Sequence, residues 1–500
     1  MRTLSNDPPA GPVPAPTGPR RTKIVATVGP ASDSRQVLAA MRAAGMDMAR
    51  VTLAHGATSE AVERVRNLRE AVPEVSVLVD LPGPKIRAAP FPVGGVVLET
   101  GAEVTLVPGG AAGLASSAEL IPVSYPALLD GLEPGDRVAL GDGGVALTVR
   151  RRDTAGVAAA VESGGLLQGR PGITAPAGRL TLETPTPEDL ERVEVMVGEE
   201  VDAIAISFVR GAEDVVAVRR AAERAAERAG APVPMLVAKM ETPEAIADLD
   251  AIVDTADAVM VARGDLGVRM ALEDIPHSQK RIIRSAVRFG RPVITATQML
   301  ESMVTASSPT RAEVTDVANA VLDGTSAVML SGETAVGVDP AGVVATMARI
   351  ARRAEQDFDY LGWGTNLGAQ EVAGDPSSTP RITAAITAAA WRAAVEEDAV
   401  AVIACTRTGA TARAISRFRP PMPIIGATPS SRTARQLAIS WGVVPLLVGE
   451  ASRTDEIVWF AVQSAVRAGF AAPGDVVVVL AGSPTEAQPT TDTLRLVRVH

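Results

Sequence analysis

Lys239, Glu241 and Asp265 are the residues of this chain best suited to holding a metal ion beside a positive charge. Glu241 and Asp265 could together hold one hard divalent cation, most naturally Mg²⁺ or Mn²⁺, with waters or substrate oxygens completing the shell. Lys239, two residues before Glu241, would place an ammonium beside that metal. Such a pair could stabilise an enolate or a phosphoryl group in transfer. The alternative is a structural carboxylate paired with Arg263.

Other residues near these three are suited to binding anions. The stretch RGDLG places Gly264 and Asp265 just before a predicted helical turn, where free backbone N–H groups could receive a carboxylate or a phosphate. Arg50 and Arg87 add charges suited to phosphate oxygens. The candidate metal site is therefore also a candidate anion site.

Lysine is scarce in this chain, which makes its positions informative. Only Lys23, Lys85, Lys239 and Lys280 are lysines among the 48 basic residues. Lysine offers a compact point charge where arginine offers a broad planar fork. Lys85 and Lys239 follow predicted strands, as active-site residues would. We expect Lys23 at the solvent-facing end of the first strand and Lys280 as a surface charge on a helix.

The elements that position these residues form a repeating pattern. Short apolar runs alternate with amphipathic helical stretches, as in a parallel sheet with crossover helices. Strands covered on both faces read as continuous apolar runs. An eight-stranded α/β barrel, interrupted between its third and fourth strands, is therefore predicted. Its strands are 23–28, 46–51, 75–80, 202–206, 234–239, 257–261, 292–296 and 326–330.

In such a barrel, catalytic residues gather at the C-terminal ends of the strands. Polar side chains follow seven of the eight predicted strands, and each taken alone could be a helix cap or a satisfied loop residue. Together they predict an active site on one rim. They are Arg50, Asp80, Ser207, Arg210, Lys239, Glu241, Arg263, Asp265, Thr297, Ser331 and Glu333.

The chain divides into several predicted parts. Residues 1–20 are rich in Pro, Gly and Ala and are predicted to be a disordered tail. Residues 21–87 and 178–357 form the barrel, and 88–177, with its Gly, Pro and Asp turns and no convincing helix, is an inserted all-β domain. Residues 358–380 are a loop or linker, and 381–500 are a C-terminal α/β domain.

Composition excludes several functional classes. The net charge of −10 and pI near 5.1, without a basic stripe, argue against nucleic-acid binding. No apolar run is long enough to span a bilayer, so no membrane role is expected. The single cysteine, Cys405, fits a reducing cytoplasm. His277 and His500 lack metal-ligand spacing, so zinc is not supported.

Several sequence blocks resemble the pyruvate kinase family. They occur in the family's order and extend over essentially all of 21–500. The blocks are TKIVATVGPAS (22–32), AGMDMARVTLAHG (44–56), SFVR (207–210), AKME (238–241), VARGDLGV (261–268), and RPVITATQMLESM with PTRAEVTDVANAVLDGTSAVMLSGETAVG (291–337).

The resemblance implies transfer of phosphate from phosphoenolpyruvate to ADP, giving pyruvate and ATP, in an enzyme that is usually a homotetramer. It also implies a role for each matching residue. Lys239 contacts the transferring phosphoryl group and steadies the enolate, Glu241 and Asp265 hold Mg²⁺ or Mn²⁺, and the Gly264–Asp265 backbone receives the substrate carboxylate. Arg50 binds phosphate, Thr297 sits near the protonated carbon, Ser331 and Glu333 belong to a proton relay, and His55 and Arg87 lie on the nucleotide side.

The family's usual monovalent-cation site is altered in this chain. Thr52, Ala54, Asp80 and Leu81 stand where the family has oxygen ligands, and two of those oxygens are lost. Lys85 stands where many members have glutamate. An ammonium there could replace the cation, and the pairing of Leu81 with Lys85 resembles the branch of the family that works without potassium. We therefore expect an enzyme that does not require K⁺. The alternative is that Lys85 is a solvated loop charge.

Other departures concern the nucleotide. Pro82 and Pro171 replace two usual lysines, and Arg170 could cover for the second through a shifted loop. Asp142 keeps one acidic position of the family's DDG turn. Of the properties that the resemblance implies, the affinity for the nucleotide and the identity of the phosphate acceptor are therefore the least well supported by the sequence.

A possible effector loop lies in the C-terminal domain. CTRTGATAR (405–413) resembles the family's effector-phosphate loop through Thr406, Thr408, Gly409 and Thr411. A plain strand-to-helix cap would look similar. The last loop lacks the glycines that clasp a second phosphate and carries Glu486, so a monophosphate effector, or none, is expected rather than fructose bisphosphate.

Two alternatives to an active pyruvate kinase stay open. One is a Mg²⁺-dependent barrel aldolase or lyase acting on a pyruvate enolate. The other is a divergent paralogue with weak catalysis and a regulatory role, suggested by Thr52, Pro82 and Pro171.

Overall fold

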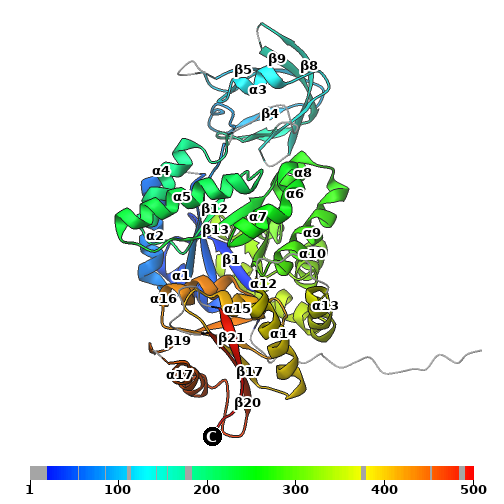
Figure 1. Ribbon diagram of the computed structural model, residues 1–500. Helices are drawn as coiled ribbons and strands as arrows, with labels where there is room; N and C mark the ends of the chain where they lie inside the picture. The colour runs from blue at the N-terminus through cyan, green and yellow to red at the C-terminus, as the bar shows by residue number, and fades with distance from the viewer. Residues whose placement is uncertain are drawn as a thin grey trace, which may run out of the picture.

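The computed structural model describes residues 20–54, 56–84, 86–109, 114–141, 144–154, 156–174, 183–372, 379–450, 453–482 and 490–500 (Figure 1). The predicted tail before Arg20 lies outside these residues. So do His55, Lys85, Asp142 and Glu486.

Eight parallel strands close into a barrel, which confirms the predicted fold class. Around the barrel they run in the order β1, β16, β15, β14, β13, β12, β3 and β2. The ends of each strand differ from the predicted range by at most two residues. The prediction succeeded because strands buried on both faces need continuous apolar runs. Their bounds are β1 (Lys23–Thr27), β2 (Met48–Thr52), β3 (Ser76–Asp80), β12 (Ala203–Ile206), β13 (Met235–Met240), β14 (Ala258–Ala262), β15 (Val293–Ala296) and β16 (Ala327–Leu330).

Alternate strand residues fill the barrel interior. Val25, Met48, Leu78, Val237 and Met260 belong to one buried cluster inside the strands. Their sequence neighbours face outward and pack under the helices. This packed interior leaves the strand ends as the place for a site.

Helices surround the barrel. Two of them begin with a capping box, in which Thr186 pairs with Asp189 and Thr310 with Glu313. The barrel helices are α1 (Arg35–Ala44), α2 (Thr58–Ala71), α4 (Pro187–Gly198), α5 (Ala212–Ala229), α6 (Pro243–Ala247), α7 (Leu249–Thr255), α8 (Arg263–Arg269), η1 (Leu272–Asp274), α9 (Ile275–Arg288), η2 (Glu301–Val304), α10 (Arg311–Leu322), α11 (Gly332–Ala335) and α12 (Pro340–Gln356).

Between β3 and α4 the chain forms separate sheets, which lie above the barrel in Figure 1. One has six strands in the order β11, β7, β8, β9, β5, β6, and β10 pairs with β4. One short helix, α3 (Ala127–Gly131), was not predicted. The strands are β4 (Val96–Leu98), β5 (Glu103–Pro108), β6 (Leu120–Val123), β7 (Arg137–Leu140), β8 (Val145–Asp153), β9 (Gly156–Ser163), β10 (Gly165–Leu167) and β11 (Ile173–Thr174).

The C-terminal part lies below the barrel in Figure 1. Its sheet has the order β19, β18, β17, β20, β21, and only β21 is antiparallel. The elements are α14 (Arg381–Glu396), β17 (Ala401–Cys405), α15 (Ala410–Ser416), β18 (Ile424–Thr428), α16 (Ser431–Gln436), η3 (Leu437–Ile439), β19 (Val443–Leu447), α17 (Thr454–Arg467), β20 (Val476–Gly482) and β21 (Thr491–Arg498).

The expectation of a loop or linker at 358–380 was wrong for its first half. Helix α13 (Tyr360–Val372) occupies that half. The Trp363 indole donates to the Arg417 carbonyl at 2.8 Å, and Leu367 is buried. Tertiary packing therefore stabilises a helix whose three glycines lower its intrinsic helix propensity.

The expectation for Lys23 needs correction, whereas Lys280 lies on helix α9 with a partly exposed side chain. Lys23 is buried, and its ammonium donates to the Val443 carbonyl of the C-terminal domain at 2.8 Å. The first strand therefore begins under that domain and not in solvent. Lys280 is partly exposed and pairs with Asp323. In the described part of the chain, no helix is both long and apolar enough to cross a membrane.

Candidate active site

The predicted strand-end residues do gather at one end of the barrel. Arg50 lies near the end of β2, Asp80 ends β3, and Lys239 is the second-last residue of β13. Parallel strands end on one rim, so their side chains converge. Ser207 and Glu241 follow β12 and β13 directly and complete the group.

Lys239 is the centre of this cluster. Its buried ammonium donates to Ser207 Oγ at 2.6 Å and lies 3.4 Å from Asp80 Oδ1 and 3.3 Å from Glu241 Oε2. Burial alone would lower the pKa of Lys239, but the charges of Asp80 and Glu241 outweigh it and raise that pKa. The group is therefore a fixed cation, suited to stabilising negative charge and not to acting as a base.

Asp80 joins Lys239 to Arg50. Arg50 Nε donates to Asp80 Oδ2 at 2.8 Å, and its Nη1 donates to Thr27 Oγ1 at 3.1 Å. Burial alone would raise the pKa of Asp80, but Lys239 and Arg50 lower it instead. Asp80 thus stays ionised and holds two cations side by side on the rim.

Glu241 and Asp265 fit a divalent cation. Glu241 Oε1 accepts a 2.5 Å hydrogen bond from the Phe208 N–H, while its buried Oε2 accepts none from the described residues. Burial raises the pKa of Glu241; Lys239 opposes this rise and Asp265 adds to it. Oε2 lies 3.3 Å from the Lys239 ammonium without a hydrogen bond, and a cation held by both carboxylates would bind it and offset the repulsion between Glu241 and Asp265. The described residues contain no cluster of three or more potential protein ligands, so substrate or water would complete such a shell.

Thr297 and the start of α8 are linked. Gly264 N–H donates to Thr297 Oγ1 at 2.8 Å, and that hydroxyl donates to the Ala296 carbonyl at 2.7 Å. Gly264 is the second residue of α8, not a residue before it, and its N–H is already paired. A carboxylate binding there would have to replace the Thr297 hydroxyl.

Ser331 and Glu333 lie together after β16. The Glu333 carboxylate accepts from Ser331 N–H at 2.6 Å and from Leu300 N–H at 3.1 Å. The Ser331 hydroxyl is buried and has no hydrogen-bond partner in the described part of the chain. Glu333 therefore fixes the loop, and the Ser331 hydroxyl is left available for another partner.

Two strand-end arginines have structural contacts instead. Arg210 binds Asp214 at the start of α5, and its Nη2 lies 3.2 Å from that carboxylate. Arg263 pairs with Asp316 at 2.7 Å. The alternative in which Arg263 neutralises a metal-binding carboxylate therefore does not hold, because Asp316 of α10 takes its charge.

Arg87 links the barrel to the inserted sheets. Its Nη2 donates to the Ala54 carbonyl at 2.6 Å and its Nη1 to the Arg170 carbonyl at 3.0 Å. Burial, with the charge of Arg170, lowers the pKa of Arg87. His55, predicted with Arg87 on the nucleotide side, and Lys85, predicted to replace the monovalent cation, lie outside the described residues.

Three threonine hydroxyls of the loop predicted to bind an effector make hydrogen bonds within the protein. Thr406 Oγ1 accepts from Gly409 N–H at 2.9 Å, and Thr408 Oγ1 accepts from Ala410 N–H at 3.5 Å. The buried Thr411 hydroxyl bonds to that of Thr491 at 2.7 Å. These contacts hold the loop to itself and to β21, and α15 begins after Gly409 without a side-chain cap.

Sequence reasoning missed two contributors to the site. Phe208, with φ of 58°, turns its N–H toward Glu241, and Asp316 binds Arg263 from α10. No local pattern marks a left-handed phenylalanine. A signal for Asp316 was present in the sequence. Helix α10 has two acidic residues, and because Glu313 is used in the capping box, Asp316 is the one free to pair with a basic residue.

Comparison with known proteins agrees with this geometry. Residues 19–344 match the family described as "Pyruvate kinase, barrel domain", and residues 384–497 match "Pyruvate kinase, alpha/beta domain". The pyruvate kinase of Clostridium acetobutylicum is 36% identical over 483 residues, which is 95% of this chain and 99% of the relative. That of Methylorubrum extorquens is 39% identical, over 96% of this chain and 98% of the relative. That of Geobacillus stearothermophilus is 38% identical, over 96% of this chain and 80% of the relative. The chain therefore belongs to the pyruvate kinase family and is an enzyme of the phosphotransferase class.

Proposed function

We propose that this enzyme transfers phosphate from phosphoenolpyruvate to ADP, giving pyruvate and ATP in glycolysis. The observation that carries the proposal is the buried Lys239 ammonium, held by Ser207, Asp80 and Glu241 at the strand ends. Phosphoryl transfer depends mainly on positioning and on neutralising charge. This cluster supplies both on a rigid barrel.

Each residue has a role in this proposal. Lys239 and Arg50 contact the phosphoryl oxygens, and Lys239 also stabilises the enolate oxygen left behind. The Gly264 and Asp265 backbone binds the substrate carboxylate. Thr297 and Ser331 place hydroxyls for proton delivery to the enolate carbon, and Glu333 holds Ser331 in place.

Mg²⁺ or Mn²⁺ would be held by Glu241 and Asp265. Bound there, the cation would neutralise negative charge on substrate oxygens. Two observations support this assignment: Glu241 Oε2 accepts no hydrogen bond from the described residues, and the pKa of that carboxyl is raised. On the nucleotide side we place His55 and Arg87.

A coupled assay with phosphoenolpyruvate, ADP and Mg²⁺ tests the proposal. Turnover is expected in the wild type, and Lys239→Ala is expected to lower kcat by about 100- to 1,000-fold, the effect of removing one preorganised charge. Lys280→Ala is the matched control, because Lys280 lies on α9 and pairs with Asp323. Near-normal turnover in Lys239→Ala would refute the mechanism, and a wild type without turnover would favour the divergent regulatory paralogue.

We also propose that K⁺ is not required. Leu81 is buried and offers no oxygen, and Thr52 Oγ1 already accepts from Ala54 N–H at 3.2 Å. The Asp80 carboxylate is engaged by Arg50 and Lys239. Turnover is therefore expected to stay within about twofold when Na⁺ replaces K⁺ at constant ionic strength. A steep rise with K⁺ would contradict this.

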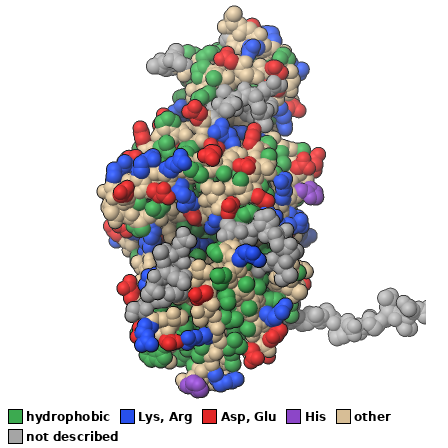
Figure 2. Space-filling view, in the orientation of Figure 1, with side chains coloured by type: hydrophobic (Ala, Val, Ile, Leu, Met, Phe, Trp, Pro, Cys, Tyr) green, Lys and Arg blue, Asp and Glu red, His purple; other side chains and the backbone are tan. Residues whose placement is uncertain are grey.

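A cytoplasmic homotetramer with a separate regulatory loop is the proposed physiological form. Figure 2 shows hydrophobic side chains gathered on one face of the C-terminal domain. Leu447, Trp459 and Leu496 of this domain are about half exposed, as expected of surface that a second copy covers. Light scattering coupled to size exclusion would give the assembly's mass.

Titration with sugar monophosphates would test whether the loop with Thr406, Thr408, Gly409 and Thr411 binds an effector.

A further inference from the structure

Phe208 combines a strained backbone with a contact to a proposed metal ligand. It lies two residues after β12 and has φ of 58°, a left-handed conformation that bulky residues rarely adopt. In this conformation its N–H donates to Glu241 Oε1 at 2.5 Å. Such strain persists only where the surrounding structure holds the residue in place, and it is concentrated at functional sites. The contacts that hold Phe208 therefore bear on the position of the Glu241 carboxylate.

Two neighbours contact the Phe208 ring. The guanidinium carbon of Arg269 lies 5.0 Å from the ring centroid, within the range of a cation–π contact. On the loop after β3, a Cβ added at Gly83 would lie 2.7 Å from Phe208 Cδ2, so no larger residue could approach the ring as this glycine does. The half-buried ring is therefore in contact with both α8 and the loop that leads from β3 to the inserted sheets.

Arg269 connects the ring to the second proposed metal ligand. It is the last residue of α8 and lies four residues after Asp265, so the two side chains share one face of the helix. The Arg269 Nε is buried and has no hydrogen-bond partner among the described residues. Phe208 thus contacts the helix of Asp265 through its ring and Glu241 through its N–H.

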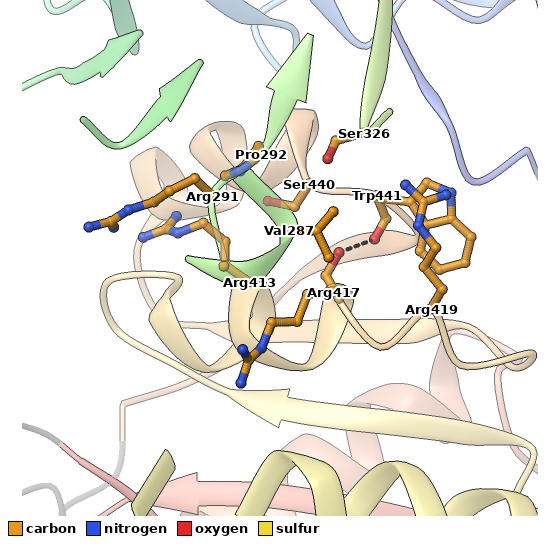
Figure 3. Close-up of a pocket in the computed structure, with 11 residues that line it drawn as sticks. Val287, Arg291, Pro292, Ser326, Arg413, Arg417, Arg419, Ser440 and Trp441 are labelled. Atoms are coloured by element: carbon orange, nitrogen blue, oxygen red, sulfur yellow. Dashed lines mark hydrogen bonds between the residues drawn. The ribbon is translucent and has the colours of Figure 1, made fainter. Parts of the chain in front are cut away.

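A cation–π contact can also serve packing alone. Arg419 lies 4.7 Å from the centroid of the Trp441 ring, next to it in Figure 3, and its Nη2 donates to the Thr325 carbonyl at 2.8 Å. That contact joins the C-terminal domain to the barrel where β16 begins, and not at the strand ends that carry the candidate site. Phe208 differs, because its ring and its N–H contact two elements that each carry a proposed metal ligand.

We propose that Phe208 is a positioning residue that, together with Arg269, fixes the separation of Glu241 and Asp265 for a divalent cation. The inference rests on the proposed metal site, since both carboxylates belong to it. Two carboxylates repel each other, and groups that orient metal ligands contribute strongly to metal affinity. The N–H of Phe208 fixes one carboxylate, and the cation–π contact fixes the helix that carries the other.

Mn²⁺ binding to the free enzyme, measured by electron paramagnetic resonance, tests the inference without turnover. Phe208→Gly keeps the N–H and tolerates a positive φ, but it removes the ring. Its Kd for Mn²⁺ is expected to rise about tenfold, as for other groups that orient metal ligands. Arg269→Met should raise the Kd about threefold, and Arg269→Lys, which restores a cation, should recover most of the binding.

The sign of the change separates positioning from charge. Removing a positive charge near the site would by itself tighten Mn²⁺ binding, so an unchanged or lower Kd in Arg269→Met would overturn the inference. An unchanged Kd in Phe208→Gly would also overturn it, because the N–H alone would then be sufficient. In the coupled assay, the KM for Mg²⁺ should rise in both variants while the KM for ADP stays nearly unchanged. An equal rise in both KM values would indicate a general disturbance and would contradict the positioning role.

Arg288→Met is the matched control. The guanidinium carbon of Arg288 also lies 5.0 Å from a phenylalanine ring, that of Phe289, and its Nε is likewise buried without a partner in the described part of the chain. Its Kd for Mn²⁺ should equal that of the wild type. Glu241→Gln should abolish Mn²⁺ binding; if it does not, or if the wild type binds no Mn²⁺, the proposed metal site fails together with this inference. Binding that is lost in Glu241→Gln but unchanged in the Phe208 and Arg269 variants would overturn this inference alone.

Discussion

Arg263 fixes the conformation of the residue proposed to deliver a proton. Its Nε donates to the Ala296 carbonyl at 3.2 Å, and its Nη2 donates to the Thr297 carbonyl at 2.6 Å. Thr297 and Gln298 have φ of 66° and 53°, a conformation that a β-branched residue rarely adopts. Asp316 anchors the guanidinium on the other side. Arg263 is thus a positioning residue that supports a strained turn.

Arg263→Lys should therefore lower catalysis without unfolding the protein. The three N–H groups of a lysine all leave one nitrogen, so they cannot reach acceptors that three separate guanidinium nitrogens contact. We expect kcat to fall about tenfold or more, with the KM for ADP nearly unchanged, because a small misplacement of a catalytic group costs rate and not nucleotide binding. Steady-state kinetics and Tm measure the two effects.

The control for this prediction is Arg349→Lys. Arg349 lies on the outer helix α12 and contacts Thr346. Its kinetics should match those of the wild type. An Arg263→Lys enzyme with unchanged kcat would show that the turn holds its shape without the guanidinium.

The sequence predicted which residues would reach the rim, but not their pairing. Strand periodicity and barrel topology place Asp80, Lys239 and Glu241 together. Whether an arginine there binds substrate or a structural carboxylate depends on helices distant in sequence. Arg210 and Arg263 were both predicted on the rim, and both pair with helix carboxylates, Asp214 and Asp316.

At the scale of elements, helix α13 shows why a helix can escape prediction. Gly362, Gly364 and Gly368 weaken its helical propensity. Gly364 has a packing role, because a Cβ there would lie 2.2 Å from Trp391 Cε2. Asp359 caps the first turn by accepting from Gly362 N–H at 2.8 Å. The eight barrel strands were predicted because their burial requires continuous apolar runs, whereas the contacts of α13 are tertiary.

Two alanine substitutions in α13 should therefore act in opposite directions. A Cβ added at Gly368 would meet nothing within 4 Å, so Gly368→Ala should raise the free energy of unfolding by about 0.5–1 kcal/mol. Gly364→Ala forces the Trp391 ring to move. The overpacking costs about 1–3 kcal/mol, which exceeds the gain in helix propensity, so the free energy of unfolding should fall. Urea unfolding followed by tryptophan fluorescence compares them. A shift of both midpoints in the same direction would contradict this account.

At the scale of the whole molecule, the C-terminal domain closes the end of the barrel opposite the active site. Ile439 packs with the residues inside the barrel. Asp202, at the start of β12, is fully buried and is shared by Arg69 of the barrel at 2.8 Å and Arg435 of the C-terminal domain at 2.9 Å. The domains are therefore joined by both an apolar contact and a buried charge cluster.

Arg435→Gln should loosen the C-terminal domain while leaving the barrel folded. Asp202 would keep Arg69 and the Val77 N–H but lose one charge-assisted hydrogen bond, worth about 1.5–3 kcal/mol when buried. Trp363, Trp391, Trp441 and Trp459 are the only tryptophans, and all follow the barrel in sequence. Their fluorescence thus reports the C-terminal part, whereas circular dichroism reports the whole chain. We expect the fluorescence midpoint in urea to fall and to separate from the circular dichroism midpoint.

Arg495→Gln is the matched control, because its pair with Asp455 is exposed and worth about 0–1 kcal/mol. If both substitutions shifted the fluorescence midpoint equally, the buried cluster would not be what holds the two domains together.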